Sequence, residues 1–293
     1  MTRDVRIFEV GPRDGLQNEK VLIPTQDKIA LIDILSSAGF DRIEATSFVS
    51  PKWVPQLADA ADVMAGITRR RGVGYAVLTP NMKGFERAVA AGADEVAVFA
   101  SASEAFSQKN INCSIAESLD RFAPLMASAR DAGLLVRGYV SCAVDCPYSG
   151  AVDPERVRDV AAMLDEMGCY EISLADTLGR ARPDAVFAML ETVVDVIPAE
   201  RLAGHFHDTG GQALANVAVA LDLGLRTFDS AVGGLGGCPY APGAKGNLST
   251  RALVTMLEER GLRTGIDLRR LSQAEQLVAG VTRNPVLSTE YST

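Results

Sequence analysis

Short runs of β-branched and aromatic residues alternate with helical stretches along nearly the whole chain. The runs recur about every 20 to 40 residues, which leaves room for one helix between consecutive strands. Eight runs fit this description: residues 5–10, 42–46, 74–78, 95–100, 135–140, 170–174, 202–207 and 227–232. Alternation of strand and helix is typical of a parallel sheet in the α/β class. Eight such units with no linker between them predict a (β/α)8 barrel, also called a TIM barrel, rather than a doubly wound sheet.

The helical stretches carry boundary signals that agree with this arrangement. We expect Thr25 to cap a helix that ends before Gly39, and Asp153-Pro154 to begin another with proline at its first position. No linker rich in proline or serine divides the 293 residues. We therefore predict a single domain over residues 1–293, with the barrel over about residues 5–260. The remainder, about residues 261–293, is predicted to form a short C-terminal extension with one helix at 268–279.

Composition narrows the class of function. The chain has 29 Lys and Arg against 37 Asp and Glu, a net charge of −8, and this acidic balance argues against nucleic-acid and anionic-membrane partners. No apolar run reaches the roughly 20 residues that cross a bilayer, and we expect no secretory signal peptide. Five cysteines, an odd number, do not resemble a disulfide framework. A reduced, cytoplasmic setting is expected.

The least ordinary residues follow the predicted strands, which is where a TIM barrel has its active site. Arg13 and Asp14 follow the first strand, and Glu44 lies in the second strand, which is otherwise expected to be buried. Asp176 ends the sixth strand, and Cys238 follows the eighth strand after a run of glycines. These side chains are therefore candidates for an active site at the barrel mouth.

His205 and His207, in the seventh predicted strand, are the two histidines of the chain. Residues i and i+2 of a strand point to the same face, so both imidazoles can enter the barrel mouth together. With a carboxylate from another strand they would make a metal site with open positions, and Asp14 is the candidate carboxylate. Two alternatives stay open: buried histidines held by backbone hydrogen bonds, and a turn role for Asp14. Arg13 beside a divalent cation implies an anionic substrate between them.

The glycine-rich loop and the residues after it offer further candidates. A cysteine on such a loop can act as acid, base or nucleophile, and an inert small thiol is the alternative for Cys238. The loop lacks the spacing of a phosphate-binding loop. Asn247 is either a turn residue or, through its amide oxygen, a ligand for a hard metal. The remaining cysteines are expected to be structural: Cys113, Cys142, Cys146 and Cys169.

Taken together, these residues resemble the 3-hydroxy-3-methylglutaryl-CoA lyase family, a branch of the metal-dependent barrel lyases and Claisen-type synthases. The glycine-loop cysteine motif is specific to the lyases, whereas the Arg-Asp and His-x-His pieces are shared with the condensing synthases. The matching segments are residues 9–20 (EVGPRDGLQNEK), 46–55 (TSFVSPKWVP), 109–114 (KNINCS), 137–142 (RGYVSC), 168–174 (GCYEISL) and 234–241 (GLGGCPYA).

The resemblance implies an enzyme that cleaves (S)-3-hydroxy-3-methylglutaryl-CoA to acetyl-CoA and acetoacetate, a step of leucine degradation and ketone-body formation. It also implies a homodimer that binds a CoA thioester and uses Mg²⁺ or Mn²⁺. The implied roles are: Asp14, His205, His207 and Asn247 for the metal; Arg13, Cys238, Glu44 and Asp176 for catalysis; and Arg13 and Gln17 for the substrate.

The chain departs from some relatives beside the histidines, where Gly210 replaces a tyrosine and Phe206 a cysteine. Loss of the tyrosine would widen the acyl pocket, so a 3-isohexenylglutaryl-CoA-type analogue is an alternative substrate. A Claisen-condensing acyl-CoA synthase is the enzymatic rival, and a barrel that only binds metal and CoA thioesters is the non-enzymatic rival. The base that takes the hydroxyl proton is open among Asp14, His205 and Asp176.

Overall fold

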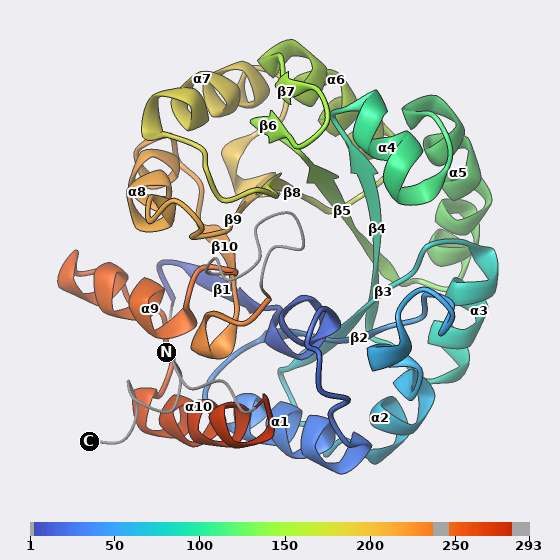
Figure 1. Cartoon of the computed structure of the whole chain (residues 1–293), viewed down its shortest axis with the longest axis vertical. Coiled ribbons are helices and arrows are strands. Elements are labelled where there is room, and N and C mark those ends of the chain that lie inside the picture. Colours follow the sequence, from blue (N-terminus) through green and yellow to red (C-terminus); the bar gives the residue numbers. More distant parts are fainter. Residues whose placement is uncertain (1–2, 237–245, 283–293) are drawn as a thin grey trace.

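The computed structural model describes residues 3–236 and 246–282. Within them, eight parallel strands close into a barrel with the order β1-β10-β9-β8-β5-β4-β3-β2 around the ring. Helices surround the barrel, as Figure 1 shows, so the chain folds as the TIM barrel that its sequence predicts. The strands are β1 (Arg6–Glu9), β2 (Arg42–Ser47), β3 (Gly74–Leu78), β4 (Glu95–Ser101), β5 (Leu135–Ser141), β8 (Glu171–Asp176), β9 (Leu202–Phe206) and β10 (Thr227–Ser230), with a separate hairpin of β6 (Asp145–Cys146) and β7 (Gly150–Ala151).

Each predicted strand coincides with a barrel strand to within two residues at either end. β3 matches at both ends, whereas β1 and β10 end earlier than predicted, at Glu9 and Ser230. After these two strands the backbone turns into short helical segments, Gly11–Gly15 and Val232–Gly234. β1 and β10 also pair with each other, and this pairing closes the barrel.

Of the two helix caps predicted from the sequence, one is confirmed by the structure. Asp153 caps α6 by accepting a hydrogen bond from the N–H of Glu155. The expected cap at Thr25 is wrong: Pro24 takes that position, and the Thr25 hydroxyl donates to Asp59 at 2.7 Å. The helices are α1 (Thr25–Ser37), α2 (Ala60–Gly66), α3 (Met82–Ala90), α4 (Glu104–Ile111), α5 (Ile115–Asp131), α6 (Pro154–Glu166), α7 (Pro183–Val194), α8 (Ala213–Asp222), α9 (Thr250–Glu259) and α10 (Leu268–Thr282), with 3-10 turns at Pro55–Leu57 and Ala199–Arg201.

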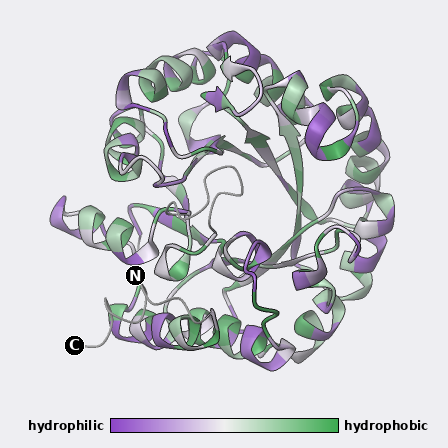
Figure 2. Cartoon of the chain, viewed as in Figure 1, coloured by the Kyte–Doolittle hydropathy of each residue, from purple (hydrophilic) through white to green (hydrophobic). Residues whose placement is uncertain are grey.

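The helices pack on the barrel through apolar faces. In α5 the buried residues Leu119, Phe122 and Met126 recur three and four positions apart, which aligns them on one face. Figure 2 shows hydrophilic residues on the outer side of the helix ring. Removal of apolar surface from water contributes about 25 cal/mol per Å², so this packing is the main stabilising contact between the two layers.

The C-terminal helix joins the same outer ring. α10 packs against α1, which lies beside it in Figure 1, and buries Leu271, Ala274 and Val278. The segment that leads into it is held by a hydrogen bond of 2.7 Å from the N–H of Asp267 to the carbonyl of Ala38. The predicted helix at 268–279 is therefore present, and the boundary between barrel and extension stays a prediction.

In the described part of the chain, no helix has both the length and the hydropathy to span a membrane. The four cysteines found there, at positions 113, 142, 146 and 169, are buried and form no disulfide. This burial agrees with the structural role expected for them.

Candidate metal centre

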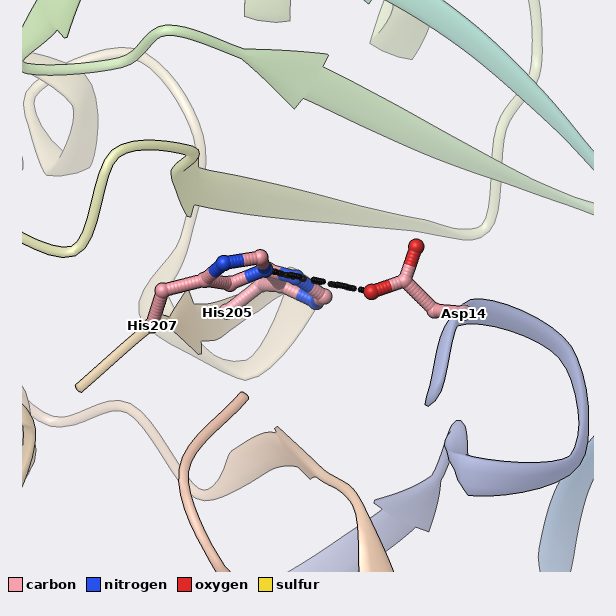
Figure 3. A group of neighbouring side chains, drawn as sticks. All are labelled: Asp14, His205 and His207. Atoms are coloured by element: carbon pink, nitrogen blue, oxygen red, sulfur yellow. Dashed lines mark hydrogen bonds and ion pairs between the residues drawn. The ribbon is translucent and has the colours of Figure 1, made fainter. Parts of the chain in front are cut away.

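Asp14, His205 and His207 gather at the C-terminal ends of β1 and β9 (Figure 3). The Nε2 atoms of the two imidazoles lie 3.2 Å apart. Asp14 Oδ2 lies 3.9 Å from His205 Nε2 and 3.8 Å from His207 Nε2. The structure thus brings together the three side chains that the strand-end pattern predicted as metal ligands.

Asp14 stands in a π-helical turn, Gly11–Gly15, that follows β1 directly. Residue 11 must be small there, because a Cβ atom would lie 2.6 Å from Glu9 Oε1. Single π-helical turns are rare in proteins, and those that occur often lie at functional sites. The turn directs Arg13 and Asp14 toward the barrel mouth, and it depends on the close approach of Gly11 to Glu9.

Glu9 connects three segments of the site. Its Oε1 accepts hydrogen bonds from the N–H groups of Gly11 and Val232, at 2.9 and 2.8 Å, and its Oε2 accepts one from the hydroxyl of Thr250 at 2.7 Å. The side chain is fully buried with no cation among these partners, and burial raises the pKa of Glu9 to about 7. One carboxyl group therefore joins the Arg13–Asp14 turn to the segments on either side of the glycine-rich loop.

His205 lies within β9, and His207 follows the strand. The backbone of His207 forms an antiparallel bridge with Asn247, which places that asparagine beside the cluster. Asn247 Nδ2 donates to Asp14 Oδ2 at 2.8 Å and to the carbonyl of Leu235 at 3.0 Å. The amide nitrogen, rather than the oxygen, therefore meets the Asp14 carboxylate, and a ligand role for Asn247 stays a proposal.

Arg13 is buried beside the cluster and binds two carboxylates. Its Nη1 donates to Asp14 Oδ1 and its Nε to Glu44 Oε2, each at 2.6 Å. Glu44 is fully buried in β2, and its Oε1 has no hydrogen-bond partner among the described residues. A buried oxygen without a partner costs free energy unless water or a ligand satisfies it. Glu44 Oε1 is therefore a candidate contact for a bound molecule.

The electrostatics of the cluster suit a cation. Burial alone would raise the pKa of Asp14, but Arg13 and the two histidines hold it well below its usual range. Burial, together with the charge of His205, lowers the pKa of His207 to about 4. At neutral pH Asp14 is thus a carboxylate and His207 a neutral imidazole, and these are the forms that bind metal ions.

A second group of charged side chains, inside the barrel below the cluster, was missed by sequence reasoning. Arg137 of β5 donates to Asp229 of β10 through Nη1 and Nη2, at 3.0 and 2.7 Å, and to Glu171 of β8 through Nε at 2.8 Å. Asp229 Oδ2 also lies 3.0 Å from His205 Nδ1. Charged residues inside predicted buried strands were the signal that could have revealed this network.

The side chains present fit a divalent cation. In octahedral coordination with bonds near 2.1 Å, adjacent ligand atoms lie about 3 Å apart, which is close to the 3.2 Å between the two Nε2 atoms. The contact between His205 Nδ1 and Asp229 leaves Nε2 to face Asp14 and His207. Two imidazoles and one carboxylate that share an open face are a common ligand set for divalent metals. The donors therefore match the metal that the resemblance implies.

Three of the expected site residues are not joined to this cluster by the described contacts. Asp176 is buried at the end of β8, where its oxygens accept the N–H groups of Gly179 and Ala181 at 3.0 and 2.9 Å. Gln17 follows the π-helical turn and is partly buried. Cys238 lies outside the described residues. The roles expected for all three stay predictions.

Fold and site together define a TIM barrel with a candidate metal centre at the ends of its strands. The sequence model named HMGL-like matches residues 4–278. The chain is 58% identical to the mitochondrial hydroxymethylglutaryl-CoA lyase of Rattus norvegicus over 278 residues, which are 95% of this chain and 86% of the rat protein. It therefore belongs to the HMGL-like family.

Two further relatives are also similar over nearly the whole chain. The 3-hydroxy-3-isohexenylglutaryl-CoA/hydroxy-methylglutaryl-CoA lyase of Pseudomonas aeruginosa is 56% identical over 281 residues, 96% of this chain and 94% of that protein. The crystal structure of the HMG-CoA lyase from Brucella melitensis superposes with a TM-score of 0.95 at 59% identity, covering 97% of this chain and all of that one. The likeness therefore covers the fold as well as the sequence.

Proposed function

We propose that this protein is a carbon–carbon lyase that cleaves (S)-3-hydroxy-3-methylglutaryl-CoA to acetyl-CoA and acetoacetate. Membership of the HMGL-like family and 58% identity to a hydroxymethylglutaryl-CoA lyase support this reaction. The observation that carries the proposal is the position of Arg13, whose guanidinium lies 2.6 Å from Asp14 within the candidate metal centre. A cation that can meet a developing enolate thus lies next to a site that can bind the substrate hydroxyl.

The reaction breaks the bond between C2 and C3 of the substrate. The hydroxyl on C3 loses its proton, C3 becomes the ketone carbon of acetoacetate, and the bonding electrons pass to C2. These electrons delocalise into the thioester as an enolate, which becomes acetyl-CoA when C2 takes up a proton. The protein must therefore orient the hydroxyl, stabilise the enolate oxygen and deliver a proton to carbon.

Asp14, His205, His207 and Asn247 would hold the metal, which we propose to be Mg²⁺ or Mn²⁺. A divalent ion held there would supply Lewis-acid polarisation of the substrate hydroxyl and a carboxylate oxygen. Arg13 pairs with the thioester oxygen as negative charge develops. Its guanidinium is already oriented by two charge-assisted hydrogen bonds, so little reorganisation accompanies the reaction.

The other expected residues take the remaining roles. Cys238 is proposed to protonate C2, and Gln17 to bind the substrate. Glu44 orients Arg13 and offers its unsatisfied Oε1 to the bound molecule, which the burial of that atom supports. Asp176 is proposed as a further active-site carboxylate.

A longer 3-substituent defines a second candidate substrate. The Pseudomonas aeruginosa relative, whose name includes 3-hydroxy-3-isohexenylglutaryl-CoA, is 56% identical to this chain. Glycine at position 210, where some relatives carry tyrosine, also supports a wider acyl pocket. The ratio of kcat/KM for the isohexenyl and methyl substrates would distinguish the two candidates.

We also propose an oligomeric state, a compartment and a domain organisation for the protein. Resemblance to the family supports a homodimer, which sedimentation would test. Buried cysteines without disulfides in the described residues support a reducing, cytoplasmic compartment. We further propose a single domain over residues 1–293, with the barrel over about residues 5–260.

One assay separates the proposed lyase from its rivals. The purified protein with Mg²⁺ is incubated with 3-hydroxy-3-methylglutaryl-CoA, and acetoacetate is measured. A condensing synthase would instead release CoA from acetyl-CoA and a 2-oxo acid, and a binding barrel would do neither. The absence of acetoacetate under metal-saturated conditions would reject the proposal.

A further inference from the structure

Asp229 is the hydrogen-bonding centre of the buried network below the metal cluster. Its Oδ2 accepts from Arg137 Nη1 at 3.0 Å and from Ser173 Oγ at 2.8 Å, and it lies 3.0 Å from His205 Nδ1. Its Oδ1 accepts from Arg137 Nη2 at 2.7 Å. Four donor atoms therefore hold this carboxylate and keep it oriented toward His205.

The contact between Asp229 and His205 determines which imidazole nitrogen faces the metal site. A carboxylate only accepts hydrogen bonds, so His205 Nδ1 must carry the proton that it donates. In the neutral ring, Nε2 then has its lone pair free. That Nε2 is the atom that faces His207 Nε2 and Asp14 Oδ2. The network thus presents a ligand atom, rather than an N–H group, to the cluster.

Arg137 holds Asp229 in place from the other side of the barrel. β5, which carries Arg137, is separated from β10 by β8 and β9, so the guanidinium crosses the barrel interior to reach Asp229. Both side chains are at most 1% exposed. Buried ion pairs are often no more stabilising than apolar residues of similar volume. A charged network in this core therefore requires a reason other than stability.

We propose that Asp229, clamped by Arg137, is a positioning residue that fixes the tautomer and orientation of His205 for metal binding. This inference rests on the proposed metal site. The carboxylate also makes the imidazole a stronger donor to the metal, as carboxylate partners of metal-ligating histidines do.

The test compares two carboxylate-to-amide variants that share Arg137. Asp229→Asn changes the group that contacts His205. Glu171→Gln is the matched control, because Glu171 also accepts from Arg137 but has no described contact with His205. Mn²⁺ affinity is measured from the electron paramagnetic resonance signal of free Mn²⁺ during titration of each metal-free protein. We expect Asp229→Asn to weaken binding by about 10- to 100-fold, and Glu171→Gln to bind nearly as the wild type does.

A second measurement needs no variant and decides the matter if Asp229→Asn does not fold. Because the chain has two histidines, a ¹⁵N-histidine spectrum of the Mg²⁺-loaded wild type contains the signals of only two imidazoles. We expect His205 to be protonated at Nδ1, with that proton shifted far downfield by the carboxylate, and unprotonated at Nε2. Protonation of His205 at Nε2 would overturn the proposal.

The outcomes separate this inference from the proposed function. Wild-type protein that binds no Mn²⁺ would reject the metal site, and the inference with it. Wild-type binding with equal affinities for the Asp229→Asn and Glu171→Gln variants would reject the positioning role alone. A selective loss of affinity in Asp229→Asn, with its fold unchanged by circular dichroism, would support it.

Discussion

Glu44 Oε2 accepts a hydrogen bond of 2.6 Å from Arg13 Nε, and this pair joins β2 to the turn that carries Asp14. Arg13 Nη1 is held by Asp14 at the same distance. Within the described residues, Nη2 forms no hydrogen bond, so it is the end of the guanidinium that can meet an incoming anion. The Glu44–Arg13 pair thus orients a buried cation at the mouth of the barrel.

Arg13→Gln is expected to lower kcat by about 10³-fold with little change in KM, because the charge acts mainly on the developing enolate. Steady-state kinetics at saturating Mg²⁺ would measure the effect. Arg42→Gln is the control, since Arg42 also binds a buried glutamate, Glu95, at 2.9 Å, but stands at the N-terminal end of β2, away from the barrel mouth. It should change stability and leave kcat near wild type. An effect of Arg13→Gln on KM alone would make Arg13 a simple substrate anchor.

Removal of the metal by a chelator is expected to abolish activity, and Mg²⁺ or Mn²⁺ to restore it. His207→Ala should weaken metal binding, because one imidazole of the cluster is lost and water must replace it. Equilibrium dialysis measures the affinity, and Tm in chelator establishes that the metal-free barrel remains folded. Full activity in excess chelator would contradict the metal-dependent mechanism.

Glu9 is expected to give the protein a pH-dependent stability. Its pKa is raised to about 7 when folded, whereas an unfolded glutamate titrates near 4.5. Between these pH values only the folded state keeps the proton, so its contribution to stability is full below about pH 4.5 and is lost as pH rises through 7. The loss amounts to about 3 kcal/mol at most, from the 1.36 kcal/mol per pKa unit.

Glu9→Gln removes this titration. Its amide oxygen can still accept from the N–H groups of Gly11 and Val232, and its amide nitrogen can donate to the Thr250 hydroxyl, which can then donate to Ser230. The difference in unfolding free energy between Glu9→Gln and wild type, measured in urea from pH 4.5 to 7.5, should therefore shift in favour of the variant as pH rises. Glu200→Gln, at an exposed site, should show no such trend. A flat difference for Glu9→Gln would reject the raised pKa.

Cys238→Ser is expected to lower kcat by at least about 10²-fold, because a serine hydroxyl is a much weaker acid than a thiol. Metal and substrate binding should change little. An alkylating reagent should modify Cys238 in the free enzyme, whereas a substrate analogue should protect it. The four described cysteines are buried and should react slowly; Cys113→Ser is the control and should keep its kcat. Modified Cys238 with an undiminished rate would rule out the general-acid role.

The barrel was predictable because its strands are largely apolar runs at regular intervals. The composition of each run indicates a buried strand without reference to the rest of the chain. The hairpin of β6 and β7 was not, because two residues per strand carry no periodic signal. The π-helical turn was also missed. Its shape depends on the approach of Gly11 to Glu9 and on Val232, which is more than 200 positions away in sequence.

The candidate metal centre was likewise predictable only in part. Asp14, His205 and His207 were predictable because two residues apart on one strand share a face, and strand ends of a barrel meet at one mouth. A charged residue inside a predicted buried strand marked Asp229 as unusual, but its pairing was not predictable, because its partner Arg137 lies 92 positions away and meets it across the barrel. The contact of Asn247 with Asp14 through its amide nitrogen likewise depends on tertiary packing.

The pairing of β1 with β10 has a consequence for how the enzyme comes into being. Asp14 follows the first strand, whereas His205 lies in the seventh barrel strand along the sequence, β9, and His207 directly follows it. A nascent chain therefore holds one proposed ligand near its start, and the two histidines are added only in the last third of its synthesis. A chain that ends before residue 205 lacks both imidazoles and cannot assemble the proposed metal site, so metal binding would show that synthesis has passed the seventh strand.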